Sequence, residues 1–399
     1  MTDLHPADRL AFDRTVVTEP VWNGFDTAAR AVGLAKNVLL HAGPPFVSVG
    51  HVTMPILNSA CVAAVYEGLA TDFDRAEAMI RAGEIVLKPA QDHGVVVPLA
   101  AVISASMPLH AVYDAYRGQV RVYAPINGGG RPSLRLGLRS GAVLDHIRWL
   151  NTTFCDVLQA GIGEGIDLVP VAARGLAGGD DCHGRTVVAG KALADEIDAR
   201  TVGGIQDADA RAFLHASPSL FLNLWMAGTK CLMRLAEGID GASLVTAAGG
   251  NGRDVGLQIA GLPGQWFTAS ATPPVGRFDV DVPQERALGA IGDSAVVEGY
   301  GLGAMAIHLS PAQMDGLGAF LPADMAVRRA AFPVGRHPVF GALDLRLGLA
   351  ARHMTTAQRG AVIGLGIIDA DGTDGRLGGG IYDMPATLAE QAIAALETA

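Results

Sequence analysis

The sequence predicts a multi-domain α/β protein in which two glycine-rich α/β portions flank a mainly helical middle segment. Three observations support this prediction. The chain has 399 residues, enough for two or three hydrophobic cores. Short apolar runs that end in glycine turns alternate with stretches whose apolar residues recur every three or four positions. The 51 glycines favour tight turns and close backbone contacts.

The N-terminal α/β portion is expected to cover residues 1–137. Val38–Leu40 and Ile85–Leu87 are short apolar segments typical of strands. Apolar residues at helical spacing are found in three segments: Phe25–Val32, Pro55–Gly68 and Phe73–Ala82. Asp72 is the predicted N-cap of the last of these helices.

The middle segment, residues 138–238, is expected to be mainly helical. Its apolar residues recur at helical spacing in four stretches and in one longer, strongly apolar stretch: Ala142–Leu158, Ile166–Leu176, Thr186–Ala199, Ala208–His215 and Leu220–Ala236. Asn223 and Lys230 lie seven residues apart in the last stretch, so they share one helical face.

The C-terminal glycine-rich α/β portion is expected to cover residues 239–399. Leu244–Ala247 is a strand candidate, and Gly249–Arg253 is predicted to turn the chain into a partner strand, Val255–Ile259. A final helix is expected over Ala386–Leu396.

Charge and hydropathy narrow the classes of function. The formal charge of −10, with no basic run, disfavours nucleic-acid binding. No run approaches eighteen apolar residues and the N-terminus lacks a signal-peptide pattern, so no membrane association and a cytoplasmic location are expected. The cysteines show no CxxC spacing and are expected to be small core residues: Cys61, Cys155, Cys182 and Cys231.

The segment Gly292–Ala295, followed by Glu298, combines two carboxylates and a serine with glycines in an otherwise apolar region. A buried carboxylate is costly unless it is paired, so Asp293 and Glu298 are expected to have assigned partners. The alternative is a helix N-terminus capped by Asp293, with Glu298 solvated. Leu40–Pro45 and Asn251–Arg253 show the same mixture, and all three segments are expected to line one site.

Seven segments occur in the same order as in a known family: Leu39–Pro45, Ser104–Pro108, Gly179–His183, Asn223–Ala227, Asn251–Gly252, Trp266–Ala269 and Gly292–Ala295. On these segments the chain resembles the YlbE-like family, which includes a subunit of oxamate carbamoyltransferase from anaerobic allantoin degradation. The resemblance implies a cytoplasmic α/β enzyme of nitrogen catabolism that moves a carbamoyl group. It also implies a partner subunit similar to the α-subunit of succinyl-CoA synthetase.

The chain departs from the family at three places. Asn127–Pro132 lacks the glutamate and lysine of the family segment, Gly250 stands where relatives have arginine, and Ile363–Ile368 lacks a histidine. These departures keep two alternatives to a carbamoyltransferase open. One is an amidohydrolase, in which water replaces phosphate as the acceptor; the other is a non-catalytic scaffold subunit.

Carbamoyl transfer requires donors for a developing oxyanion, groups that bind anions, and a base. His41, before a Gly-Pro-Pro turn, and His93, beside Asp92, are candidates for moving protons. Asp293 and Ser294 are candidates for orienting the substrate. A turn-capping histidine and an exposed loop histidine are the alternatives for His41 and His93.

The substrate is expected to be a small carboxylated amide or ureido compound such as carbamoyl-oxamate. The candidates for binding it are Asn223, Lys230, Asn251, Arg253, Asp181, His183, Ser106 and Glu298. Ordinary structural roles are the alternatives: a structural ion pair for Lys230, a hairpin turn for Asn251 and Arg253, and an N-cap for Asp181.

No metal ion and no cofactor are expected. The cluster of Asp180, Asp181 and His183 lacks a full ligand set, and the chain has no P-loop and no complete dinucleotide fingerprint. The apolar composition leaves surface for a homodimer.

Overall fold

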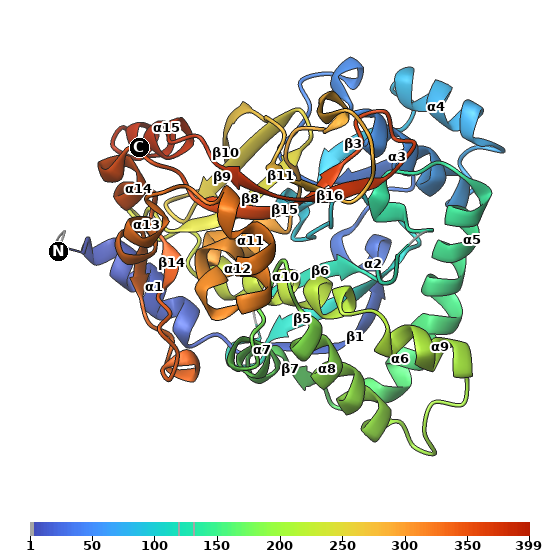
Figure 1. The fold of residues 1–399 in the computed structure, drawn as a ribbon. Helices are drawn as coiled ribbons and strands as arrows, with labels where there is room; N and C mark the ends of the chain where they lie inside the picture. The colour runs from blue at the N-terminus through green and yellow to red at the C-terminus, as the bar shows by residue number, and fades with distance from the viewer. Residues whose placement is uncertain (1–3, 119, 131) are drawn as a thin grey trace.

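The computed structural model describes residues 4–118, 120–130 and 132–399. It is an α/β structure of several parts, as predicted, in which helices surround five small β-sheets (Figure 1). In the view of Figure 1 the first described residues and the C-terminus lie on the same side of the molecule. Most strand pairs are antiparallel, and β2 with β3 forms the parallel pair among the named strands.

The first sheet has the strand order β6-β5-β1-β7. These strands are β1 (Pro20–Thr27), β5 (Pro108–Asp114), β6 (Arg121–Pro125) and β7 (Ile166–Asp167). The helix predicted over 25–32 is therefore wrong in its first turn, and α2 covers only Ala28–Val32. Phe25 pairs with His110 across the sheet and packs on Trp22, so long-range pairing outweighs the local helical spacing.

The second sheet, of order β3-β2-β4, packs against one helix, on which a second helix packs in turn. Its strands are β2 (Val38–His41), β3 (Val86–Pro89) and β4 (Val102–Ile103), and the helices are α3 (Met54–Tyr66) and α4 (Phe73–Arg81). Asp72 caps α4 as predicted, because its carboxylate accepts a hydrogen bond from the Arg75 N–H at 2.8 Å. The remaining N-terminal helix is α1 (Pro6–Val16).

The segment 138–238 consists mainly of helices. They are α5 (Gly141–Trp149), α6 (Cys155–Ile162), α7 (Leu168–Ala177), α8 (Val187–Arg200), α9 (Ala208–His215) and α10 (Ser219–Arg234). One π-helical turn, Leu150–Phe154, joins α5 to α6, so the helix predicted over 142–158 continues through both. The helix α10 is buried along most of its length and packs against both β5 and β8 (Figure 1).

The C-terminal segment holds three sheets. Their strand orders are β10-β9-β8-β12, β11-β16-β15 and β13-β14. The strands are β8 (Val245–Asn251), β9 (Asp254–Ile259), β10 (Leu262–Ser270), β11 (Val275–Phe278), β12 (Ile291–Gly292), β13 (Pro333–Gly335), β14 (Leu347–Leu349), β15 (Val362–Ile368) and β16 (Arg376–Asp383). The predicted hairpin of β8 and β9 is confirmed, but Gly249–Asn251 belongs to the strand rather than to the turn.

The helices of this segment are short apart from the last. They are α11 (Ala295–Tyr300), α12 (Pro311–Leu317), α13 (Met325–Ala331), α14 (Ala351–Ala357) and α15 (Thr387–Leu396). The last confirms the predicted C-terminal helix. Ser294 is the N-cap residue of α11, so Asp293 does not cap this helix.

The largest hydrophobic core draws on all three predicted portions. It contains Trp22 from the first, Phe154 and Trp225 from the second, and Tyr300 from the third. The domain boundaries at 137/138 and 238/239 stay a prediction. The four cysteines are free thiols, three of them buried and Cys155 half-buried, in line with the predicted core role. In the described part of the chain, no helix is both long and apolar enough to cross a membrane.

Candidate functional site

A cavity of about 420 Å³, called the main cavity below, opens between the ends of several elements. The loop after Val97, together with Asn127 and Arg135, forms one wall, and α10 forms another. The remaining walls come from the loop between α7 and α8, from α12, and from the paired strands β15 and β16. Segments from all three predicted portions therefore meet here.

Arg135 is the most informative side chain in this cavity. Its guanidinium donates to neutral acceptors, namely Asn127 Oδ1 at 2.9 Å and the carbonyl oxygens of Gly128 at 3.2 Å and Gly129 at 2.6 Å. Among the described residues no carboxylate forms an ion pair with Arg135. Burial, together with the nearby charge of Arg376, lowers the pKa of Arg135 to about 10. A half-buried cation without a counter-charge is a ready partner for an anion.

Two further arginines line the main cavity from the paired strands β11 and β16. Arg376 forms an ion pair with Asp279 at 2.7 Å, and Arg277 has no carboxylate partner within the described ranges. Both side chains are exposed. Since Asp279 is the one carboxylate among the residues that line this cavity in the described chain, the lining carries a net positive charge.

His183 lies in the same cavity and is paired with a fully buried carboxylate. Its Nδ1 is 2.6 Å from Oε1 of Glu298, which also accepts hydrogen bonds from the N–H groups of Gly364 at 2.9 Å and Ala304 at 3.2 Å. The His183 Nε2 has no hydrogen-bond partner among the residues that the structure describes. Burial alone would lower the pKa of His183, but the charge and hydrogen bond of Glu298 and the charge of Asp181 raise it. Burial raises the pKa of Glu298 as well, so the pair retains a proton readily.

Two aspartates shape the loop that presents His183. Asp181 Oδ1 accepts hydrogen bonds from the N–H groups of His183 at 2.9 Å and Arg185 at 2.8 Å. Asp180 caps α8, because its carboxylate accepts from the Val187 N–H at 3.1 Å and the Ala189 N–H at 2.9 Å. Between Asp181 and His183, Cys182 has a φ of 59°, a conformation that costs energy for a non-glycine residue. Backbone strain of this kind concentrates at functional sites.

Asn223 and Ser294 also line the main cavity. The Asn223 side chain is 1% exposed, and its Nδ2 donates to the Asn127 carbonyl oxygen at 3.2 Å. Its Oδ1 has no partner in the described structure. A buried acceptor without a partner is costly, so a donor from a ligand or a water would stabilise it.

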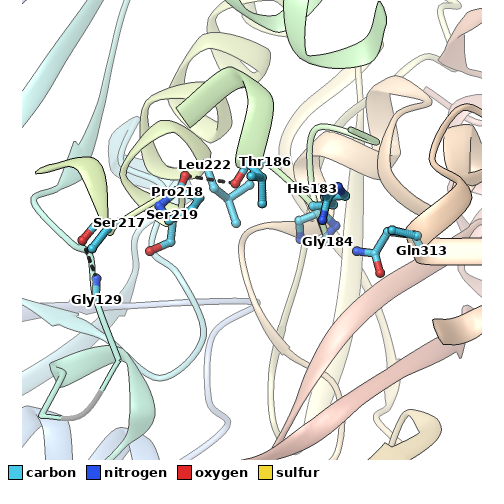
Figure 2. A pocket seen from close by; sticks show the side chains of 13 residues that line it. Gly129, His183, Gly184, Thr186, Ser217, Pro218, Ser219, Leu222 and Gln313 are labelled. Carbon is cyan, nitrogen blue, oxygen red and sulfur yellow. Dashed lines mark hydrogen bonds between the residues drawn. The ribbon is translucent and has the colours of Figure 1, made fainter. Parts of the chain in front are cut away.

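A second cavity of about 370 Å³ adjoins the main cavity. The two share the residues His183, Gly184, Ser219, Leu222 and Gln313. Figure 2 shows this second cavity, with His183 and Gln313 on one side and Ser217, Pro218 and Ser219 at the start of α10 on the other. His183 therefore stands in the wall that the two cavities have in common.

Asp293 points away from the main cavity although Ser294, its neighbour, lines it. Its Oδ1 accepts from the Gly43 N–H and from Gln91 Nε2, both at 2.8 Å, and its Oδ2 accepts from the Val97 N–H at 2.9 Å. Burial raises the pKa of Asp293 to about 7, against the three donors, which favour the charged form. The carboxylate is thus hydrogen-bonded to three residues from distant parts of the chain, as expected for a buried carboxylate.

The two histidines predicted to move protons lie elsewhere. His41 is fully buried at the end of β2, where Nδ1 contacts the Ala42 carbonyl oxygen at 2.8 Å and the ring packs on Phe46. Burial lowers the pKa of His41 to about 4. His93 lines a separate surface depression together with Asp92 and Arg121. Neither is among the residues that line the two cavities, so the site proposed below does not include them.

Four of the predicted substrate-binding residues also lie outside both cavities, in structural settings. Lys230 forms a structural ion pair with Glu237, because its Nζ donates to Glu237 Oε1 at 2.9 Å. The same Nζ donates to the Thr246 carbonyl oxygen at 2.7 Å. Asn251 Oδ1 accepts from the backbone N–H groups of Arg253 and Asp254 in the hairpin turn. The Arg253 side chain is exposed, and Ser106 donates to Glu67 at the surface.

The main cavity therefore brings together three of the predicted residues, Asn223, His183 and Ser294, with Glu298 and Asp181 behind His183. Sequence reasoning missed the other polar and charged residues of the lining: Asn127, Arg135, Ser219, Arg277, Asp279, Gln313 and Arg376. One signal was present for Asn127, which opens the Asn-Gly-Gly-Gly run. The arginines had none, since an isolated arginine in a strand or turn is usually solvated.

Within residues 4–118, 120–130 and 132–399, no group of three or more His, Cys, Asp or Glu side chains is arranged to hold an ion.

Comparisons with known proteins place this geometry in context. Residues 85–294 match the family model described as oxamate carbamoyltransferase subunit AllG. The chain is 32% identical to the oxamate carbamoyltransferase subunit AllG of Escherichia coli K12, over 99% of this chain and 98% of that protein. It is 31% identical to the uncharacterised protein YahG of the same organism, over 97% of this chain and 84% of YahG. A crystal structure of a conserved protein of unknown function from Enterococcus faecalis V583 has the same fold, with a TM-score of 0.91 and 25% identity over 98% of this chain and 97% of that one.

Proposed function

This chain belongs to the family of the oxamate carbamoyltransferase subunit AllG, and from this premise we propose that its main cavity is the site of a carbamoyl transfer. The substrate is a small carboxylated amide or ureido compound such as carbamoyl-oxamate, and the acceptor is phosphate. The family relationship supports a role in a carbamoyltransferase; the substrate and the chain's own catalytic part are the proposal.

One observation carries the proposal: Arg135 lines the main cavity without a carboxylate partner in the described chain, and the nearby charge that lowers its pKa is that of another arginine, Arg376. Oxamate and carbamoyl-oxamate each carry one carboxylate. Arginine binds a carboxylate through two parallel hydrogen bonds, and it does so best where water is partly excluded. Arg135, assisted by Arg277 and Arg376, would hold this end of the substrate.

The opposite end of the substrate would then face His183 and Asn223. In the phosphate-dependent direction, the bond between the carbamoyl carbon and the oxamate nitrogen breaks and a bond from that carbon to a phosphate oxygen forms. The proton of hydrogen phosphate ends on the oxamate nitrogen. His183 can move this proton through Nε2, because Glu298 fixes Nδ1 and stabilises the imidazolium that forms in between.

A product assay tests the proposal. Purified protein, alone and with the partner subunits that co-purify, is incubated with carbamoyl-oxamate and phosphate, and oxamate and carbamoyl phosphate are measured. We expect phosphate-dependent formation of both products, and a loss of at least 100-fold in kcat/KM in Arg135→Gln. Arg174→Gln is the matched control, because Arg174 pairs with Glu196 on the surface.

The same assay separates the two alternatives. If oxamate forms equally fast without phosphate, the protein is an amidohydrolase. If a complex that assembles normally keeps full activity in Arg135→Gln and in His183→Asn, this chain is a scaffold. We further propose a cytoplasmic location and a partner similar to the α-subunit of succinyl-CoA synthetase, both of which the sequence resemblance implies. We also propose a homo-oligomeric state, for which the apolar composition leaves surface.

A further inference from the structure

The proposed binding of the carboxylated substrate in the main cavity leaves the second cavity unused, although the two cavities share a wall. Its lining within the described ranges contains no aspartate or glutamate. It does contain hydrogen-bond donors of the kind that oxyanions prefer: the guanidinium of Arg185, the hydroxyl groups of Ser217 and Ser219, and the amide of Gln313. The Thr186 hydroxyl is already used, because it donates to the Pro218 carbonyl oxygen at 3.0 Å.

The start of α10 adds positive potential to this cavity. The helix has 16 residues, its N-cap residue Pro218 offers no side-chain cap, and its first turn has no acidic residue. A helix of this length presents a partial positive charge at its N-terminus. In contrast, α8 begins at the same cavity but is already capped by the buried carboxylate of Asp180.

The side chain of His183 is the independent observation that points to a ligand. It is only 6% exposed, it lines the second cavity as well as the first, and its Nε2 has no partner in the described structure. Arg185 lies two residues further along the same loop and is only weakly paired, at 3.5 Å from Asp180. A guanidinium and an imidazole therefore line this cavity, while their carboxylate partners Asp180 and Glu298 are fully buried and are not part of its lining.

We propose that the second cavity binds the second substrate, a tetrahedral oxyanion such as inorganic phosphate, beside the carboxylated substrate in the main cavity. The inference rests on the proposed function. His183 then stands between the two substrates: Nε2 takes the proton from hydrogen phosphate as the new carbon–oxygen bond forms. It returns this proton to the amide nitrogen as the carbon–nitrogen bond breaks, so protons and charge balance without another reactant.

Two variants test the second cavity without touching the first. Arg185→Gln removes the guanidinium and is expected to raise the Kd for inorganic phosphate about tenfold or more. Val187→Asp adds a carboxylate on an exposed residue that lines only the second cavity. A negative charge in the first turn of α8 is compatible with helix stability, so this variant should fold while it repels phosphate. Val187→Thr is its neutral control.

Calorimetric titrations with inorganic phosphate and with oxamate give the decisive comparison, in the purified chain and in any complex with its partner subunits. We expect phosphate to bind in the presence of saturating oxamate, and both variants to weaken phosphate binding while the Kd for oxamate changes less than twofold. The inference is overturned if oxamate displaces phosphate, if phosphate does not bind, or if neither variant changes its affinity. If the inference on phosphate fails in one of these ways but Arg135→Gln still weakens the binding of oxamate, the proposed function remains supported.

Discussion

At the scale of single residues, the role of a side chain depends on its partners more than on its type. The chain has 11 histidines, and His41 and His93 stood out because of the turn and the carboxylate beside them in sequence. His183 is the histidine that lines both cavities, because Glu298, 115 residues away, holds its Nδ1. The sequence marked both residues as binding candidates, but their contact across 115 positions leaves no local pattern.

The pair of His183 and Glu298 predicts the pH dependence of the reaction. His183 must be unprotonated to take a proton, and its pKa is raised above the ordinary value, so activity should fall as the pH drops through that raised pKa. In Glu298→Gln the raising charge is lost and burial then lowers the pKa, so the acidic limb of kcat/KM should move to lower pH. We also expect the plateau to drop about 10- to 100-fold.

A pH–rate profile of the two proteins checks this, with Glu67→Gln as control because Glu67 contacts Ser106 outside both cavities. An acidic limb at the same pH in wild type and Glu298→Gln would contradict the assigned role of Glu298.

The unpaired Oδ1 of Asn223 predicts selectivity for an amide substrate. Oxamate and pyruvate have the same shape, but the amide group of oxamate donates hydrogen bonds where pyruvate has a methyl group. If Oδ1 accepts from this amide, wild type should bind oxamate about 10- to 100-fold more tightly than pyruvate, since the methyl group leaves the acceptor unpaired.

Asn223→Leu should bring the two affinities within about twofold of each other. A variant that was only misfolded locally would weaken both ligands and leave their ratio unchanged. The ratio of the two dissociation constants is therefore the quantity to measure.

At the scale of elements, local pattern predicted most helices well. The helix α4 with its cap Asp72, the helix α9 and the buried helix α10 follow from spacing and capping alone. Strand β1 was missed where its register depends on partners about 85 residues away. Local pattern also does not show which glycines the fold requires, because this depends on which atoms of distant residues lie where a side chain would be.

Gly303 is the clearest such case, and it predicts a specific defect. A Cβ added there would lie 2.3 Å from Glu298 Oε1, and its φ of 60° disfavours any other residue. We expect Gly303→Ala to lower the free energy of unfolding by about 2–4 kcal/mol and to abolish most of the activity, since it displaces Glu298.

Gly33→Ala is the matched control, because Gly33 has a φ of 65° and no atom within 4 Å of the added Cβ. It should cost only about 1 kcal/mol and leave activity unchanged. Equal stabilities of the two variants in thermal or urea unfolding would show that crowding at Glu298 is unimportant.

At the scale of the whole molecule, the site is an assembly of segments that lie far apart in the chain. The main cavity is lined by residues from Pro98 to Gly379. Asp293 shows how they are joined, because it binds Gly43, Gln91 and Val97. The sequence indicated that Asp293 needed partners, but the identity of partners 196 to 250 residues away follows only from the tertiary fold.

Asp293 also predicts how global stability changes with pH. Its pKa is about 7 in the folded protein and about 4 in an unfolded chain. The folded state therefore binds more protons in this range, so the contribution of this group to the free energy of unfolding falls as the pH rises from about 4 to about 7.

In Asp293→Asn, the free energy of unfolding should no longer include this pH-dependent contribution. At pH 5 the variant should be about 1–3 kcal/mol less stable than wild type, because its amide group faces the Val97 N–H. Urea unfolding at several pH values measures both effects. The same slope in wild type and variant would mean that Asp293 does not titrate in this range.

The hydrogen bonds of Asp293 also have a consequence for biosynthesis. Ribosomes add about 5–20 residues per second, so Val97 waits about 10–40 s for an acceptor that is 196 residues away. Until residue 293 has been synthesised, the N–H groups of Gly43 and Val97 have no carboxylate to which they can donate. The N-terminal part is thus expected to complete this hydrogen-bond network only after residue 293 has left the exit tunnel.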